Sequence, residues 1–420
     1  MLGVDMGSLT QGERFRNGLA FAALSLVLVV PGGPMLLALT LSAMGVWAFK
    51  DWRKDLAQAW QWPEVRIMAM GLTVFVGVGI FLGVWYGYRP GYYEAFIPFL
   101  LAPLMLQGVL KARLQAAVLW LGASTAAILA GALASYQSLV LLTGRATGAM
   151  NHPIIFGDLS VVLACVALFG LLYFEQARQR TWMQVHLLLG AVMGVWGSLL
   201  SGTKGGWLSI IMVLFVFAWR VTANKPVLWR YVGVLLIAAL MVKGVWLAPE
   251  ALVRGRLEGV WGHAQHWFET GQVTDWSVSI RLELWSYALQ LFAQRPVLGW
   301  SGGEALAKLA EHLKPFNVPD GIAPVFENDL LHYAAVSGTL GVLSVVGLYV
   351  SVFAGFWRCQ KQGAQTSAYA LLGMLLVVLI FEFGLTVNAL GRNAFRYFFC
   401  TLSVMLLGLV LMSVKGRKGE

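Results

Sequence analysis

The chain has 420 residues, of which 59% are hydrophobic and only 12% are charged, and its mean hydropathy is +0.72. About a quarter of the residues of a soluble domain are charged, so this composition excludes an ordinary soluble protein and indicates one that crosses a membrane several times. The net charge of +10 would suggest a nucleic-acid partner in a soluble protein, but here the positive residues gather between apolar runs. We therefore expect a lipid bilayer as the surroundings and no nucleic acid as a partner.

Apolar runs separated by charged residues, glycine or proline predict the membrane helices. A helix needs about 20 apolar residues to cross a bilayer, and the sequence has room for about a dozen. The expected spans are 17–31, 33–49, 66–87, 94–110, 114–135, 158–174, 184–200, 205–219, 229–246, 330–357, 366–385 and 394–413. The expected fold class is therefore an all-α polytopic membrane protein with about twelve transmembrane helices.

The distribution of lysine and arginine predicts the orientation. With the N-terminus inside, most of these residues in short loops fall on the cytoplasmic side, where they are favoured, so both termini are expected in the cytoplasm. The long polar segment 247–329 then lies outside, after transmembrane helices 1–9 in residues 1–246 and before helices 10–12 in 330–420. Within this loop, Leu252–Phe268 and Leu282–Gln294 are expected to form amphipathic helices.

Five positive residues remain in the short loops on the outer side, where topology disfavours them. We interpret them as candidates for binding an anionic substrate; extension to lipid headgroups is the alternative for each one. The segment Ser201–Gly206 is the clearest case, because its glycines precede a span whose first N–H groups and helix dipole attract anions; a plain tight turn is the alternative. The five residues are Arg89, Arg145, Lys204, Arg392 and Arg396.

Arg281 adds a cation from the long loop, at the predicted start of an amphipathic helix. Its planar guanidinium is always charged and suits phosphate oxygens, although a surface ion pair with Glu283 is the alternative. The sequence has no Asp-x-Asp motif and no histidine cluster with metal-ligand spacing. We therefore expect neither a metal nor another cofactor.

His332 is expected one turn into the helix that follows the loop, capped by Asn328 or Asp329. Asp329, three residues earlier, lies on the same helix face and could orient the imidazole. A histidine beside a carboxylate and opposite several arginines fits a general base. Glu327 and Asp329 are competing candidates for that role, while His152 fits loop packing better.

Together these segments resemble the O-antigen ligase and O-antigen polymerase superfamily. The order of the motifs and the single large loop late in the chain extend the resemblance over nearly the whole length. The motifs are Thr203-Lys204-Gly205-Gly206, Ile280-Arg281 through Trp285 to Pro296-Val297-Leu298-Gly299, and Glu327-Asn328-Asp329-Leu330-Leu331-His332 with Gly338 and Gly341.

Two departures from the family pattern concern the chemistry. The family usually has Ser-Arg where this chain has Thr203-Lys204, which keeps the charge but not the bidentate fork. Its loop-end motif commonly begins His-Asn, whereas Glu327 precedes Asn328 here. We favour His332 over Glu327 as the base, with both kept as candidates.

The resemblance implies a GT-C-like glycosyltransferase of lipopolysaccharide biosynthesis in the bacterial inner membrane, with a periplasmic active site. The donor would be O-antigen linked to undecaprenyl pyrophosphate and the acceptor lipid A-core, in an inverting, metal-independent transfer. An O-antigen polymerase or a protein O-oligosaccharyltransferase using the same donor is the alternative. A transporter is disfavoured, because charged residues within the spans are expected to be few, with Glu382 and Arg396 as the exceptions.

The implied roles fall on two groups of residues. Catalysis is assigned to His332, Arg281, Glu327 and Asp329. Binding of the pyrophosphate is assigned to Lys204, Arg281, Arg145, Arg89 and Arg392.

Overall fold

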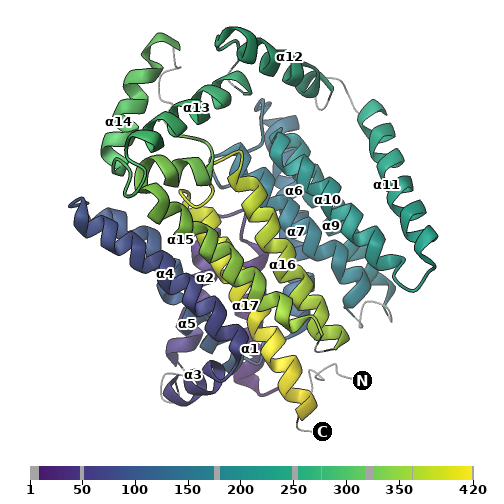
Figure 1. The fold of residues 1–420 in the computed structure, drawn as a ribbon. Helices are drawn as coiled ribbons and strands as arrows, with labels where there is room; N and C mark the ends of the chain where they lie inside the picture. Colours follow the sequence, from purple (N-terminus) through teal and green to yellow (C-terminus); the bar gives the residue numbers. More distant parts are fainter. Residues whose placement is uncertain are drawn as a thin grey trace.

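The structure is a computed structural model that describes residues 9–47, 52–174, 180–247, 254–275, 277–316, 325–361 and 363–418. Every regular element within these ranges is a helix (Figure 1), which confirms the expected all-α polytopic membrane fold. Nine helices in the same ranges are long and apolar enough to cross a membrane. The sharply bent pair α2 (Gly33–Trp47) and α3 (Trp52–Trp60) makes a tenth span if the two helices are counted together.

The nine spanning helices correspond to nine of the expected runs. They are α4 (Pro63–Trp85), η3 (Pro90–Phe96) with α5 (Ile97–Lys111), α6 (Ala116–Ser135) with η4 (Tyr136–Val140), α7 (Pro153–Tyr173), α9 (Thr181–Ser201), α10 (Lys204–Val221), α15 (Asp329–Cys359), α16 (Ala364–Gly384) and α17 (Asn393–Lys418). The other three expected runs fall in α1 (Gln11–Ser25), α2 and α11 (Val227–Leu247). Of these, α1 has only 15 residues, fewer than a bilayer-spanning helix needs.

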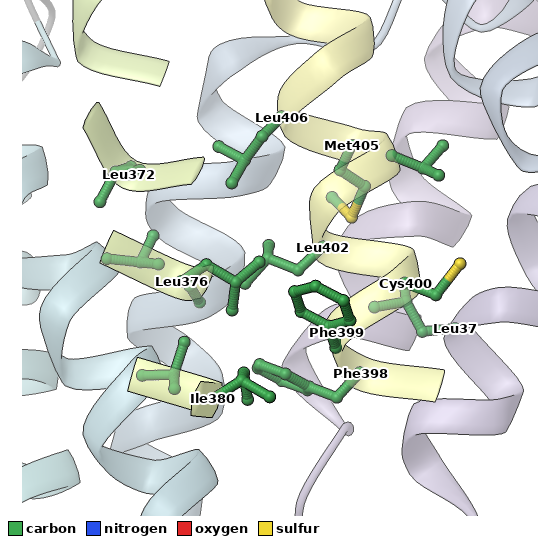
Figure 2. Close-up of a cluster of buried hydrophobic side chains, with 14 of the residues drawn as sticks. Leu37, Leu372, Leu376, Ile380, Phe398, Phe399, Cys400, Leu402, Met405 and Leu406 are labelled. Atoms are coloured by element: carbon green, nitrogen blue, oxygen red, sulfur yellow. The ribbon is translucent and has the colours of Figure 1, made fainter. Parts of the chain in front are cut away.

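The centre of the bundle is the contact between α16 and α17. Leu372, Leu376 and Ile380 follow one another at intervals of four along α16, so they share one face of the helix, and all three are buried. Phe398 and Leu402 present the matching face of α17 (Figure 2), and both are also buried. Burial of these apolar side chains stabilises the packing of α16 against α17. The connection between the two helices carries part of the site described below.

Three helices from the long polar segment lie together at one end of the bundle. They are α12 (Arg254–Thr270), α13 (Ser279–Gln294) and α14 (Gly302–Leu313), at the end opposite to the last turns of α17 (Figure 1). The helix expected over Leu282–Gln294 is confirmed by α13. The helix expected over Leu252–Phe268 corresponds to α12, with 252 and 253 lying outside the described residues.

The helix α14 was not expected from the sequence. Its Ala305, Leu309 and Leu313 repeat every four residues and are buried in a small core of their own with side chains of α13. A capping signal precedes them, because the hydroxyl of Ser301 accepts the backbone N–H of Glu304 at 3.3 Å. This serine followed three residues later by glutamate is a sequence signature of a helix start that could have revealed α14.

A kink in α15 receives the segment that connects α13 to α14. Gly338 has φ +62° and ψ −158°, which breaks the helix, and Gly299 on the connecting segment has φ +74°. A Cβ on Gly338 would lie 2.4 Å from the carbonyl carbon of Val297, and one on Gly299 would lie 2.5 Å from the backbone nitrogen of Ser337. Backbone hydrogen bonds across this contact include Trp300 N–H to Ala335 O at 3.0 Å. Glycine is therefore needed on both sides of the crossing.

Candidate functional site

The site lies where α15 begins, between α13 and the connection from α16 to α17. The side chain of Asn328 caps α15, as expected, by accepting the backbone N–H of Leu331 at 3.0 Å. Its amide nitrogen also donates to the carbonyl of Leu385 at 3.0 Å. The capping residue thus fastens the start of α15 to the segment that follows α16.

Asp329 also holds the start of α15 to the α16–α17 connection. Its carboxylate accepts the backbone N–H of Leu390 at 2.9 Å and the hydroxyl of Tyr349 at 3.2 Å, and the side chain is only 2% exposed. Neither contact involves His332, whose Nδ1 has no hydrogen-bond partner among the described residues. The expected orientation of the His332 ring by Asp329 is therefore wrong: the carboxylate is taken by Leu390 of the α16–α17 connection and by Tyr349 further along α15.

Glu327 and Arg392 lie close together where Asn328 and Asp329 hold the start of α15 to the α16–α17 connection. Arg392 Nη2 lies 4.0 Å from Glu327 Oε1, while Glu327 Oε2 is buried and has no hydrogen-bond partner among the described residues. Burial raises the pKa of Glu327 above its ordinary value, and the positive charges of Arg281 and Arg392 oppose that rise. A carboxylate with a raised pKa and an unused oxygen is a stronger proton acceptor than a solvated one.

His332 lies one turn into α15, as expected, and is partly buried. Its ring packs near Phe326 and Tyr333, with ring centroids 6.0 Å and 5.6 Å away. Arg392 is close enough for its positive charge to interact electrostatically with the His332 ring. Buried ring nitrogens normally have a partner, so the unpaired Nδ1 is available to a proton-donating substrate.

Two further cations approach this region from α10 and α13. Arg281 lies in the first turn of α13, and its Nη1 donates to the carbonyl of Ser277 at 2.6 Å, while its Nε is buried without a partner among the described residues. Lys204 is the first residue of α10, and its Nζ lies 3.2 Å from Ser277 Oγ. The two expected cations therefore meet at one residue, although nothing in the sequence indicated Ser277.

The Ser201–Gly206 turn is built as predicted, but its glycines have packing reasons. Gly202 ends α9 with φ +65°, and Arg145 braces the turn by donating from Nε to the carbonyl of Ser201 at 2.7 Å. A Cβ on Gly205 would lie 2.8 Å from Thr386 Oγ1, and one on Gly206 would lie 3.0 Å from Asp158 Oδ1. Close contact with α7 and with the α16–α17 connection therefore accounts for both glycines.

The two remaining outer arginines are placed differently. Arg89 is exposed at the start of η3 and, within the described ranges, makes no hydrogen bond or ion pair with the other candidate residues. Arg396 donates from Nη1 to the carbonyl of Leu390 at 3.0 Å and so supports the connection that carries Arg392. The structure thus brings together Lys204, Arg281, Arg392, Glu327 and His332 around the start of α15, with Arg145 bracing the turn before Lys204.

Two residues near the site were not predicted to matter. His152 precedes α7, and its Nδ1 is buried without a partner in the described chain. Burial lowers the pKa of His152 to about 4, and the charges of Arg392 and Arg145 add to this effect, so its ring is neutral at pH 7. The isolated position of His152 in a glycine-rich loop gave no sequence signal for this placement.

The second is Asp158, which corrects the expectation that Glu382 and Arg396 are the exceptional charges within the spans. Asp158 lies in α7, is 0% exposed, and has no hydrogen-bond partner for either carboxylate oxygen among the described side chains and backbone. Glu382, Arg281 and Arg145 are the charged groups close enough to act on it. Its position at the edge of a predicted span was the one available signal.

The fold and this cluster define a multi-pass membrane protein with cations, a glutamate and a histidine gathered at one end of its bundle. Residues 189–346 match the model of a protein family described as O-antigen ligase. The match contains Lys204, Arg281, Glu327 and His332, and it supports the resemblance to the O-antigen ligase/polymerase superfamily. No curated protein matches the chain.

Proposed function

We propose that this protein is an O-antigen ligase, which transfers O-antigen from undecaprenyl pyrophosphate to lipid A-core at the periplasmic face of the bacterial inner membrane. The observation that carries the proposal is the meeting of Lys204, Arg281 and Arg392 with Glu327 and His332 at the end of the bundle that holds α12–α14. Cations beside a candidate base suit a reaction in which an anionic group leaves and a hydroxyl loses a proton. Both chain termini lie in the cytoplasm under this proposal.

The donor side of the reaction is assigned to the cations. Negative charge grows on the pyrophosphate as its bond to the sugar breaks, and Lys204, Arg281 and Arg392 stabilise it. Arg145 contributes by bracing the turn before Lys204. We leave Arg89 out of this set, because it makes no hydrogen bond or ion pair with the other candidates among the described residues. Fixed cations supply the charge stabilisation that a metal provides elsewhere, so chelation should leave transfer by the purified protein unchanged.

The acceptor side is assigned to His332, with Glu327 as the competing base. One of the two accepts the proton of the attacking sugar hydroxyl, which approaches the anomeric carbon from the face opposite to the pyrophosphate and inverts its configuration. Asp329 is a positioning residue in this scheme, since its carboxylate holds the connection that carries Arg392.

A deletion strain separates the ligase from its alternatives. A ligase deletion should accumulate lipid-linked O-antigen and leave lipid A-core bare, and the wild-type chain should restore attachment. Core that carries single O-antigen repeats would instead identify a polymerase. Unchanged lipopolysaccharide with loss of protein-linked glycan would identify a protein O-oligosaccharyltransferase.

A further inference from the structure

Ser277 contacts two cations that come from different parts of the fold. Its hydroxyl lies 3.2 Å from Lys204 Nζ, and its backbone carbonyl accepts from Arg281 Nη1 at 2.6 Å. Lys204 begins α10 within the bundle, whereas Arg281 belongs to α13 at the end of the bundle. One residue therefore contacts both cations.

The turn that carries Ser277 is held by Asp275. One carboxylate oxygen, Oδ2, accepts the backbone N–H groups of Ser277 and Val278, both at 2.9 Å, and Oδ1 accepts that of Ser279 at 2.8 Å. Burial opposes ionisation, but these N–H donors hold the pKa of Asp275 below its ordinary value, so it is charged at neutral pH. The hydroxyl of Ser279 closes the turn by accepting the N–H of Thr274 at 2.9 Å.

Capping of α13 alone explains Asp275 and Ser279, because their hydrogen bonds satisfy the first N–H groups of that helix. It does not explain the side chain of Ser277, which reaches a residue of another helix. Lys204 and Arg281 repel each other and both have many rotamers. Ser277 gives each of them an acceptor, its hydroxyl for Lys204 and its carbonyl for Arg281, which lowers the cost of holding them close.

We propose that Ser277 is a positioning residue that presents Lys204 and Arg281 together to a pyrophosphate group. The proposal rests on the function proposed above, in which these two cations bind the donor. The hydroxyl of Ser277 acts through Lys204, and its carbonyl, fixed by the Asp275 turn, acts through Arg281. Removal of the hydroxyl should therefore weaken pyrophosphate binding through Lys204 alone.

The test measures the affinity of the purified full-length protein in nanodiscs for farnesyl pyrophosphate. Ser277→Ala should weaken binding about tenfold, near the lower end for a hydrogen bond to a charged group. The same substitution in a Lys204→Ala background should cause no further loss, because its partner is already absent. Ser277→Thr keeps the hydroxyl and should bind as the wild type does. Ser286→Ala is the matched control, because the Ser286 hydroxyl contacts Gln290 of its own helix at 3.5 Å.

The outcomes separate this inference from the proposed function. Wild-type affinity in Ser277→Ala, or an equal loss with and without Lys204, would overturn the positioning role while the donor site stands. Wild-type affinity in both Lys204→Ala and Arg281→Ala would overturn the donor site itself, and the inference with it.

Discussion

Arg392 Nη2 lies 4.0 Å from Glu327 Oε1, and the connection that brings them together is held by the carboxylate of Asp329. Since Arg392 opposes the rise in the pKa of Glu327 that burial causes, Arg392→Ala should raise this pKa further. Glu327 would then take up a proton at higher pH. If activity needs its ionised form, the loss of activity on lowering the pH should begin at a higher pH than in the wild type. A pH profile of glycan transfer by the purified variant checks this.

The control for that profile is Arg392→Ala in a Glu327→Gln background. Glu327 no longer titrates there, so the substitution should leave the acid side of the profile where the single Glu327→Gln variant has it. A shift of the same size in both backgrounds would show that Arg392 acts on another group, with His332 the first candidate.

The identity of the base can be decided by two variants measured side by side. If His332 accepts the proton, His332→Ala should lose about a hundred- to ten-thousand-fold in turnover, the usual contribution of a general base. Donor affinity should change little, and Glu327→Gln should be milder. Turnover by His332→Ala together with an inactive, donor-binding Glu327→Gln would assign the base to the carboxylate.

The cations should govern donor affinity. Arg281→Ala and Lys204→Ala are each expected to weaken donor binding about 10- to 100-fold, because each removes a charged partner of the pyrophosphate. Lys204→Arg keeps the charge and should retain much of the affinity. Lys314→Ala is a control in the same loop, since Lys314 is exposed and paired with exposed Glu311. Wild-type donor affinity in both Arg281→Ala and Lys204→Ala would contradict the proposal that these cations stabilise the pyrophosphate.

Asp329 should matter for folding more than for chemistry. Asp329→Ala leaves the buried N–H of Leu390 and hydroxyl of Tyr349 without their acceptor, which should cost about 1–3 kcal/mol in the free energy of unfolding. Asp329→Asn keeps one acceptor oxygen and should be milder. Unfolding in detergent and glycan transfer are measured together. An Asp329→Asn protein with wild-type stability but no activity would show that Asp329 takes part in the reaction itself.

The crossing at Gly338 predicts a strong stability effect. Gly338→Ala places a Cβ 2.4 Å from the Val297 carbonyl in a backbone conformation with φ +62°, so the loss should exceed about 2 kcal/mol. Gly347→Ala is the control on the same helix, because a Cβ there meets nothing within 4 Å. Thermal unfolding of the two purified variants makes the comparison. Equal stability of the two variants would show that the backbone at the kink adjusts to the added Cβ at little cost in free energy.

Local features of the sequence determined the class of protein and the positions of the main site residues along their helices. Long apolar runs require helices in a bilayer, the cap at Asn328 marked the start of α15, and the glycine turn marked the start of α10 at Lys204. Each of these follows from chemistry within a few residues. The same reasoning could have found α14 from Ser301 and Glu304.

Only the tertiary structure decided which of these residues meet. Asp329 binds Leu390 and Tyr349 where the sequence suggested His332, and Ser277 contacts both Lys204 and Arg281. Membrane helices are apolar on faces that meet lipid as well as on faces that meet protein, so periodicity does not reveal their neighbours. Partners of polar groups at the helix ends depend on that packing, which is why these contacts had to be seen in the fold.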